Sequence, residues 1–317
     1  MDSREEIRNR GLRIAILSGG NGSEREVSLV SGRSVQTAVR DLDLPCDLFE
    51  LEANRLPGGL HSRDHLALPL IHGQYGEDGQ LSAELEAGGF AYCGCSRASS
   101  VLCYDKLACK ALTARQGIPV ARDVRIPSGP LPSYADLRAQ LGERFILKPR
   151  RDGSSVGLFL VDSPEKHATV AASWPREDSL AEAYIEGVDL TVGILGGEPL
   201  GIVAVHPEGG LYDYAHKYTR GKTRYEVPAV VSEAVKASLF SWSRDLFELC
   251  GCRDLARIDF RLGASGEAAF LEINTLPGMT PTSLLPMTAS CAGLDFPNLV
   301  LRCIECALAR RLPTDNP

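Results

Sequence analysis

The segment ARIDFRLGASGEAAFLEIN, residues 256–274, carries the strongest pattern in the chain. Residues 256–262 and 268–273 are two runs rich in apolar residues, and a glycine-containing turn separates them. Two such runs around a short turn predict a β-hairpin. Polar residues alternate with apolar ones along each run, so the polar side chains of each strand project from a single face.

Four polar residues stand on these strand faces. Arg257 and Asp259 share one face of the first strand, and Glu272 and Asn274 share one face of the second. If the strands pair, two carboxylates and an amide lie together, and Mg²⁺ takes oxygen ligands of this kind alongside substrate phosphates. The alternative is a strand face exposed to solvent. We favour ligand binding because unpaired charges on an otherwise apolar hairpin are costly.

A second candidate site is the basic, glycine-rich segment that follows Lys148. Lys148 ends a predicted strand, residues 150–157 contain two arginines and two glycines, and a further strand is predicted at 158–161. Backbone N–H groups in such a turn can cradle phosphate oxygens, and the lysine adds a positive charge. Lys106, in a predicted helix, is a second candidate phosphate ligand. A solvent-exposed hairpin and a surface lysine are the respective alternatives.

Glycine-rich segments also follow two predicted strands in the first part of the chain. Residues 13–18 lead into glycines and then Glu24 at the start of a helix, and residues 66–71 lead into His72 and a glycine-rich loop. Alternating strands and helices imply a parallel sheet that binds ligands at the carboxyl ends of its strands. We therefore expect both side chains to border a ligand site, although Glu24 also suits an ordinary helix start.

The whole chain predicts an α/β protein with α+β parts. Further helices are expected at residues 99–116, 134–141, 232–250 and 296–310. Boundaries near residues 95 and 185 divide the chain into three domains, which are an N-terminal parallel α/β domain (1–95), a central domain with the glycine-rich phosphate loop (96–184) and a C-terminal domain with the polar hairpin (185–317).

Composition excludes several classes of protein. The chain has 317 residues, of which 44% are hydrophobic and 24% charged, and its formal net charge is −7. These are ordinary globular values, and the acidic balance disfavours a nucleic-acid binder. No window approaches the ~20 apolar residues of a membrane-spanning helix, and the charged first residues do not resemble a secretory signal. We therefore expect a cytoplasmic protein with neither nucleic-acid nor membrane partners.

The ten cysteines are too sparse for a disulfide scaffold. Without an export signal we expect them to be reduced. Close pairs stand at positions 93 and 95, 250 and 252, and 303 and 306. Two of these pairs have C-x-C spacing rather than the usual zinc-binding C-x₂₋₄-C. A zinc site is an alternative, but buried or surface thiols are the favoured interpretation, since free cysteine behaves as a small hydrophobic residue.

Seven blocks of the sequence resemble, in the same order, the D-alanine–D-alanine ligase family of the ATP-grasp superfamily. The blocks are GGNGSEREVS (19–28), HGQYGEDG (72–79), DK (105–106), KPRRDGSSVG (148–157), YDYAHKY (212–218), RID (257–259) and EINTLPGMT (272–280). The likeness runs from about residue 13 to residue 308. It implies an ATP-grasp fold, in which the central and C-terminal domains enclose ATP behind an N-terminal α/β domain.

The resemblance implies a ligase that acts in peptidoglycan precursor synthesis. ATP phosphorylates the carboxylate of one D-alanine, and the amine of a second D-alanine attacks the acyl phosphate. The tetrahedral intermediate collapses to D-alanyl-D-alanine and phosphate, and the ADP left by the first step is the third product. Two Mg²⁺ ions are implied as cofactors, with Mn²⁺ as a substitute, and a homodimer is implied as the assembly. Since an acyl phosphate hydrolyses in water, mobile loops that close over the site suit this chemistry.

The resemblance also implies a role for each group of site residues. Those expected to bind ATP are Lys106, Lys148, Ser154, Ser155, Glu182, Ala183, Ile185 and Asp189. Those expected to hold the Mg²⁺ ions are Asp259, Glu272 and Asn274. Those expected to take part in catalysis are Glu24, Ser154, Lys217, Tyr218, Arg257 and Gly278, with the last two stabilising an oxyanion. Those expected to border the D-alanine sites are Glu24, His72, Ser283 and Leu284.

Three positions depart from the common family pattern. Ala183 stands where many relatives carry lysine, and Asp189 stands where glutamate is usual. His216 lies in a mobile loop where ligases that make D-alanyl-D-lactate also use a histidine, but Tyr218 favours the dipeptide-forming type. The alternatives are a ligase that joins D-alanine to D-lactate, D-serine or another amino acid, and a catalytically silent ATP-binding module.

Overall fold

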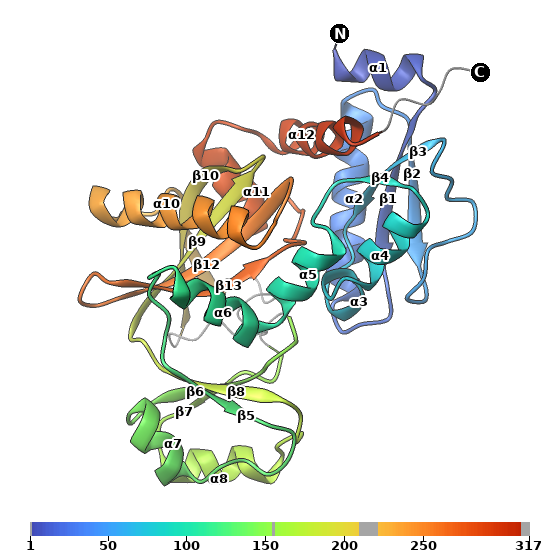
Figure 1. Ribbon diagram of the computed structural model, residues 1–317. Coiled ribbons are helices and arrows are strands. Elements are labelled where there is room, and N and C mark those ends of the chain that lie inside the picture. The colour runs from blue at the N-terminus through green and yellow to red at the C-terminus, as the bar shows by residue number, and fades with distance from the viewer. Residues whose placement is uncertain (1, 154–155, 209–220, 312–317) are drawn as a thin grey trace.

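Three β-sheets organise the part of the chain that the computed structural model describes, residues 2–153, 156–208 and 221–311 (Figure 1). The first and third sheets share an apolar core, and the second sheet faces the third across a cavity. Helices α5 (Arg97–Tyr104) and α6 (Lys106–Arg115) run between the sheets (Figure 1).

The first sheet is parallel, as expected, with strand order β2-β1-β3-β4. Ile14 and Ile16 of β1 belong to one apolar core, and Ala15 and Leu17 belong to another, so both faces of this strand are buried. Parallel strands covered on both faces read as continuous apolar runs. The elements are α1 (Ser3–Asn9), β1 (Arg13–Gly19), α2 (Arg25–Asp41), β2 (Cys46–Leu51), β3 (His65–Pro69), α3 (Gln74–Glu77), α4 (Gln80–Ala87) and β4 (Ala91–Tyr92).

The carboxyl end of β1 requires glycine. Gly19 has a φ of +94°, and a Cβ added there would lie 2.6 Å from the carbonyl oxygen of Leu51. Glycine alone tolerates both the left-handed conformation and so close a backbone. The chain can therefore turn sharply at this end of the sheet and place Glu24 directly before α2.

The second sheet is antiparallel, with strand order β5-β8-β6-β7. Two helices cover one face (Figure 1), where Phe145 and Leu147 of β6 enter the core. The sequence analysis did not predict the second of these helices, which begins at Pro164 behind the capping residue Ser163. The elements are β5 (Asp123–Ile126), α7 (Tyr134–Leu141), β6 (Phe145–Pro149), β7 (Phe159–Val161), α8 (Pro164–Ala172) and β8 (Ser179–Ala183).

The third sheet is antiparallel, with strand order β11-β10-β9-β12-β13. The predicted polar hairpin is confirmed, because β12 and β13 pair with Asp259 opposite Glu272 and Arg257 opposite Asn274. The elements are β9 (Gly187–Leu195), β10 (Glu198–Pro207), β11 (Thr223–Glu226), α10 (Glu233–Leu249), β12 (Leu255–Gly263), β13 (Ala268–Asn274), α11 (Leu284–Cys291) and α12 (Phe296–Ala309).

The helix predicted at residues 99–116 is two helices rather than one. Asp105 is extended, with φ −88° and ψ 94°, and its side chain accepts a hydrogen bond from the N–H of Ala108. This N-cap starts α6 in a new direction. Asp105 also pairs with Arg150 and Arg151, and these contacts with residues distant in sequence stabilise the break between α5 and α6.

Some helices pack against elements that belong to another of the three predicted domains. All strands of each sheet fall within one of the three predicted domain ranges, but α5 and α6 pack on β13, and α12 packs on α2 and β3. The domain boundaries at residues 95 and 185 stay a prediction. In the described residues, no helix taken singly has the length and apolar character to cross a membrane; α11 and α12 pass that test only as a pair, bent by 101°.

Candidate active site

A cavity lies between the second and third sheets. Its walls come from β6 and β8 on one side and from β9, β12 and β13 on the other. Alternation along β6 explains the chemistry of the first wall, since Phe145 and Leu147 enter the core while Ile146 and Lys148 line the cavity. The alternation of side chains along β6 thus places Lys148, the predicted phosphate ligand, in the cavity between the sheets.

Lys148 belongs to a buried network of three charges. Glu182 on β8 pairs with Lys148 through one carboxylate oxygen and with Lys110 of α6 through the other. Lys110 also pairs with Asp123 at 2.9 Å. Burial alone would raise the pKa of Glu182, but the two ammonium groups outweigh it and lower that pKa. The carboxylate therefore stays ionised and holds Lys148 in place at the cavity wall.

Lys106 joins the same cavity from the first turn of α6. Its Nζ donates to the carbonyl oxygen of Asp152 at 2.5 Å and lies 3.5 Å from Glu272 Oε2. The lysine therefore bridges the start of the glycine-rich loop and the polar hairpin. The resemblance assigned Lys106 to ATP and Glu272 to Mg²⁺, and the structure brings the two side chains together.

The polar hairpin presents charged side chains to the cavity. Arg257 donates three hydrogen bonds of 2.9, 3.3 and 2.7 Å to Asp259, and the hydroxyl of Thr191 donates to the same carboxylate. Glu272 lies opposite Asp259 in the strand register, and both line the cavity. Asn274 Oδ1 accepts the N–H of Leu276 at 3.0 Å. Two carboxylates and an amide oxygen in one patch match the oxygen ligands that Mg²⁺ takes.

Four further residues that the resemblance assigned to ATP line this cavity. Glu182, Ala183 and Ile185 stand on its wall. Asp189 also lines it and pairs with Arg261 at 2.8 Å. Arg261 in turn donates to the Ile185 carbonyl at 3.0 Å, so an arginine fixes the position of the shorter acid.

A second cavity lies at the carboxyl ends of the parallel strands, where Glu24 and His72 were expected. His72 donates from Nδ1 to the Leu276 carbonyl at 3.0 Å, because a carbonyl oxygen only accepts, and its Nε2 lies 3.4 Å from Ser31 Oγ. Burial lowers the pKa of His72, so the ring is neutral at pH 7. A Cβ added at Gly153 would lie 3.0 Å from Glu24 Oε2, so the glycine-rich loop approaches this carboxylate closely.

Glu77 was quoted in a sequence block but received no role. It lines the second cavity, and its Oε1 accepts the N–H of Gly73 at 3.1 Å. Burial, followed by the nearby Glu24 carboxylate, raises the pKa of Glu77 to about 8. An acid that is protonated near neutral pH in a cavity is typical of functional sites. The signal in the sequence was an acidic pair within a glycine-rich loop.

Lys110 is the second residue that sequence reasoning missed. It is 1% exposed and holds Glu182, which in turn holds Lys148. The only local hint was its position one helical turn after Lys106, which places both on similar faces of a helix. Its partners come from β5 and β8, so sequence spacing could not reveal the network.

Gly278, Ser283 and Leu284 border the second cavity together. A Cβ added at Gly278 would lie 2.9 Å from Ser283 Oγ, which leaves little room for a larger residue. Ser283 precedes α11 and accepts the N–H of Thr280 at 3.1 Å. These contacts fix the loop that follows β13 and keep its backbone at the cavity wall.

The two cavities adjoin. Six residues line both of them: Lys106, Asp152, Gly153, Arg257, Glu272 and Leu284. Cationic and carboxylate side chains therefore stand at the junction and face both cavities. Ser154, Ser155, Lys217 and Tyr218, and also His216, lie outside the described residues.

Comparisons with known proteins identify the family. Residues 112–305 match the family model described as the D-Ala-D-Ala ligase C-terminus. A D-alanine–D-alanine ligase of Nitrosospira multiformis is 39% identical over 303 residues, which cover 93% of this chain and 96% of the relative. The chain belongs to the D-alanine–D-alanine ligase family.

Further members of the D-alanine–D-alanine ligase family agree over most of their length. The relative from Aquifex aeolicus is 36% identical, with 91% of this chain and 98% of the relative covered. The crystal structure of the Bacillus anthracis ligase complexed with ATP has a TM-score of 0.78 at 26% identity, with 94% and 98% covered. The expected ATP-grasp fold and the expected class of enzyme, a ligase, are thereby confirmed.

Proposed function

We propose that this chain joins two D-alanine molecules into D-alanyl-D-alanine, with ATP converted to ADP and phosphate. The observation that carries the proposal is the junction of the two cavities at Lys106, Arg257 and Glu272. Carboxylate activation needs a phosphate donor and an amino acid within reach of each other, and a shared wall of charged residues supports that arrangement.

ATP would lie in the cavity between the second and third sheets. Lys106 and Lys148 supply positive charge for its phosphates, and the segment from Glu182 to Ile185 borders its base. Mg²⁺ would be held by Asp259, Glu272 and Asn274, through two carboxylates and one amide oxygen. When bound, the ions would neutralise phosphate charge. Two ions, rather than one, are part of the proposal.

The first D-alanine would lie in the second cavity. Glu24 is placed to pair with its ammonium group, and neutral His72 fixes the loop around Leu276. Arg257 stands at the junction, where the substrate carboxylate would meet the terminal phosphate. The Gly278 N–H and Arg257 would then stabilise the oxyanion that forms when the second amine attacks the acyl phosphate.

The second substrate would lie near Ser283 and Leu284. D-alanine is the proposed occupant, and D-lactate, D-serine or another amino acid is the second candidate. The roles implied for Ser154, Ser155, Lys217 and Tyr218 belong to this proposal through the resemblance alone. The homodimer, the cytoplasmic location and the two domain boundaries stay predictions of the sequence.

The direct test incubates the protein with ATP, Mg²⁺ and D-alanine, measures ADP release and identifies the product by mass spectrometry. We expect ADP and D-alanyl-D-alanine in equal amounts, and less mixed product when D-lactate or D-serine is added. Turnover with another amino acid, but not with D-alanine, would overturn the proposal.

The substitution Glu272→Gln tests the proposed metal site. Loss of one carboxylate at the junction should lower kcat by about 10²–10³-fold, the range for removing one electrostatic stabiliser of a transition state. Glu267→Gln is the matched control, because Glu267 is exposed on the same hairpin. Equal kcat for the two variants would show that the metal assignment is wrong.

A further inference from the structure

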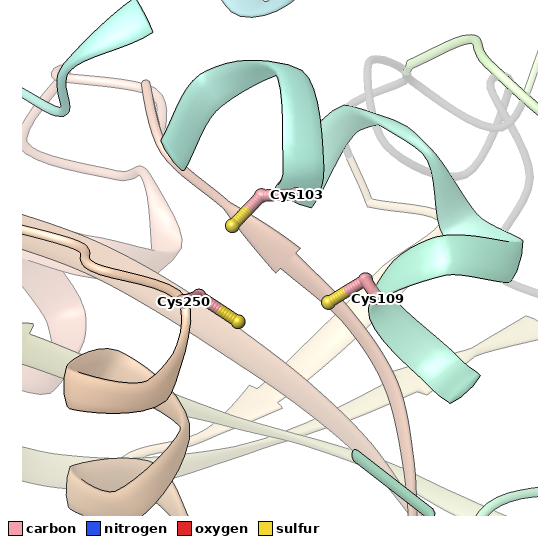
Figure 2. A group of neighbouring side chains, drawn as sticks. All are labelled: Cys103, Cys109 and Cys250. Atoms are coloured by element: carbon pink, nitrogen blue, oxygen red, sulfur yellow. The ribbon is translucent and has the colours of Figure 1, made fainter. Parts of the chain in front are cut away.

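Sulfur atoms from three separate segments meet beside the active site. Cys103 in the last turn of α5, Cys109 in α6 and Cys250 directly after α10 are buried, and their sulfur atoms all lie within 4.8 Å of one another. Figure 2 shows the three side chains pointing toward a common point. Cys252 adds a fourth sulfur, 3.8 Å from that of Cys103.

The spacing of these sulfur atoms matches a tetrahedral metal site. Zinc binds thiolate sulfur at about 2.3 Å, so two ligands of a tetrahedral site stand about 3.8 Å apart. The sulfur atoms of Cys103 and Cys252 stand 3.8 Å apart, which equals that spacing. The sulfur atoms of Cys103, Cys109 and Cys250 lie within 4.8 Å of one another, so side-chain rotation would bring them to the ligand spacing on binding. A disulfide, in contrast, requires sulfurs about 2.05 Å apart.

We propose that Cys103, Cys109, Cys250 and Cys252 bind one Zn²⁺ ion. Each thiol that becomes a ligand releases its proton to solvent, and the metal takes the place of those protons. Cys95 lies next to this group, but its thiol donates to the Arg253 carbonyl at 3.7 Å and is not required. The usual spacing rule misses this site because the ligands come from α5, α6 and the turn after α10.

The proposed ion would tie together parts of the chain that carry the active site. Lys106, which lines both cavities, stands midway between Cys103 and Cys109 in the sequence. The α5–α6 break at Asp105 lies in the same interval. A metal bound to both helices and to the turn before β12 would fix the angle of this break. The role is structural, and Cys103 links the proposed ion to the active site because it also lines the second cavity.

Cobalt binding by the wild-type protein tests the proposal without relying on a variant. The reduced full-length chain is stripped of metal with a chelator and titrated with Co²⁺ under an inert atmosphere. We expect one Co²⁺ per chain with the near-ultraviolet thiolate-to-cobalt absorption, and displacement by one equivalent of Zn²⁺. Oxygen ligands such as Glu272 do not give this absorption. Its absence in the folded, reduced protein would overturn the proposal.

Two pairs of variants locate the site. Cys109→Ala and Cys250→Ala should each lose most of the absorption and weaken Zn²⁺ binding by at least tenfold in a chelator competition. Cys291→Ala and Cys303→Ala are the matched controls, because neither residue belongs to the cluster. Unchanged absorption in Cys109→Ala or Cys250→Ala, or equal loss in the controls, would contradict the assignment.

Discussion

Glu182 holds a lysine at the wall of the cavity between the second and third sheets. Its carboxylate is 4% exposed and pairs with two lysines, of which Lys148 lines the cavity. Glu182→Gln would leave Lys110 and Lys148 without that charge in a buried setting. Removing one partner of a buried ion pair costs about 3–5 kcal/mol of stability. We expect a loss of this size in urea unfolding at pH 7, together with a higher KM for ATP.

The exposed acid Glu186 provides the control for this substitution. Its side chain is 75% exposed and pairs with Arg144 at the surface. Surface ion pairs contribute about 0–1 kcal/mol to stability. The urea concentration at which Glu186→Gln unfolds should therefore be close to that of the wild-type protein. If both variants unfolded alike, the buried network would not contribute to stability.

The same network predicts how stability depends on pH. The pKa of Glu182 is lower in the folded protein than the usual glutamate value of 4.5. A depressed carboxyl pKa contributes stability that is present above the unfolded pKa and is lost as pH falls through the folded pKa. Wild type should therefore lose stability below about pH 4.5 more steeply than Glu182→Gln. Parallel curves from pH 6 to pH 3 would contradict this account.

At the scale of elements, the break between α5 and α6 is held by Asp105. Asp105→Ala removes both the cap of α6 and the pairs with Arg150 and Arg151, and should cost about 2 kcal/mol. Asp105→Asn keeps the capping oxygen and should cost about half as much. Ser133→Ala, which removes only the cap of α7, should cost about 1 kcal/mol. Chemical denaturation of the three variants checks this order.

Local pattern predicts most of the elements and part of the site. Alternation along β12 and β13 was sufficient to place Asp259 and Glu272 together, because the side-chain period of a strand fixes its faces. The α5–α6 break could not be predicted, because the arginines that hold Asp105 come from the loop that follows β6. Helix α8 was missed, although Ser163 and Pro164 are ordinary signals of a helix start.

The contacts of residues whose partners are distant in sequence could not be predicted from the sequence alone. Lys110 and the cysteine cluster both gain their character from contacts across the fold. For these residues the sequence shows which residue types are present, but not which of them lie next to one another in the fold. The motif blocks supplied roles for many site residues, and the structure supplies the contacts between them.

At the scale of the whole molecule, α12 joins the last residues described to the first sheet. Ile304 is fully buried in a core that also contains Ile14 of β1 and Val39 of α2. Ile304→Ala should therefore destabilise the protein by about 2–4 kcal/mol. We expect the unfolding midpoint to shift with an unchanged slope, as measured by circular dichroism in urea.

Leu301, only partly buried on the same helix, is the control for Ile304. Leu301→Ala should cost less, because less apolar surface is lost from the core. An equal loss in both variants would show that α12 does not dock through its inner face. A second transition in Ile304→Ala would show that the first and third sheets unfold separately.

We propose that the terminal phosphoryl group of ATP is transferred to a substrate carboxylate at the junction of the two cavities. The most direct measurement uses D-alanine labelled with ¹⁸O in its carboxylate, and follows the label during turnover with ATP and Mg²⁺. An acyl phosphate intermediate predicts one ¹⁸O in the released inorganic phosphate for each D-alanyl-D-alanine and each ADP formed. Unlabelled phosphate, or AMP and pyrophosphate in place of ADP and phosphate, would contradict the account.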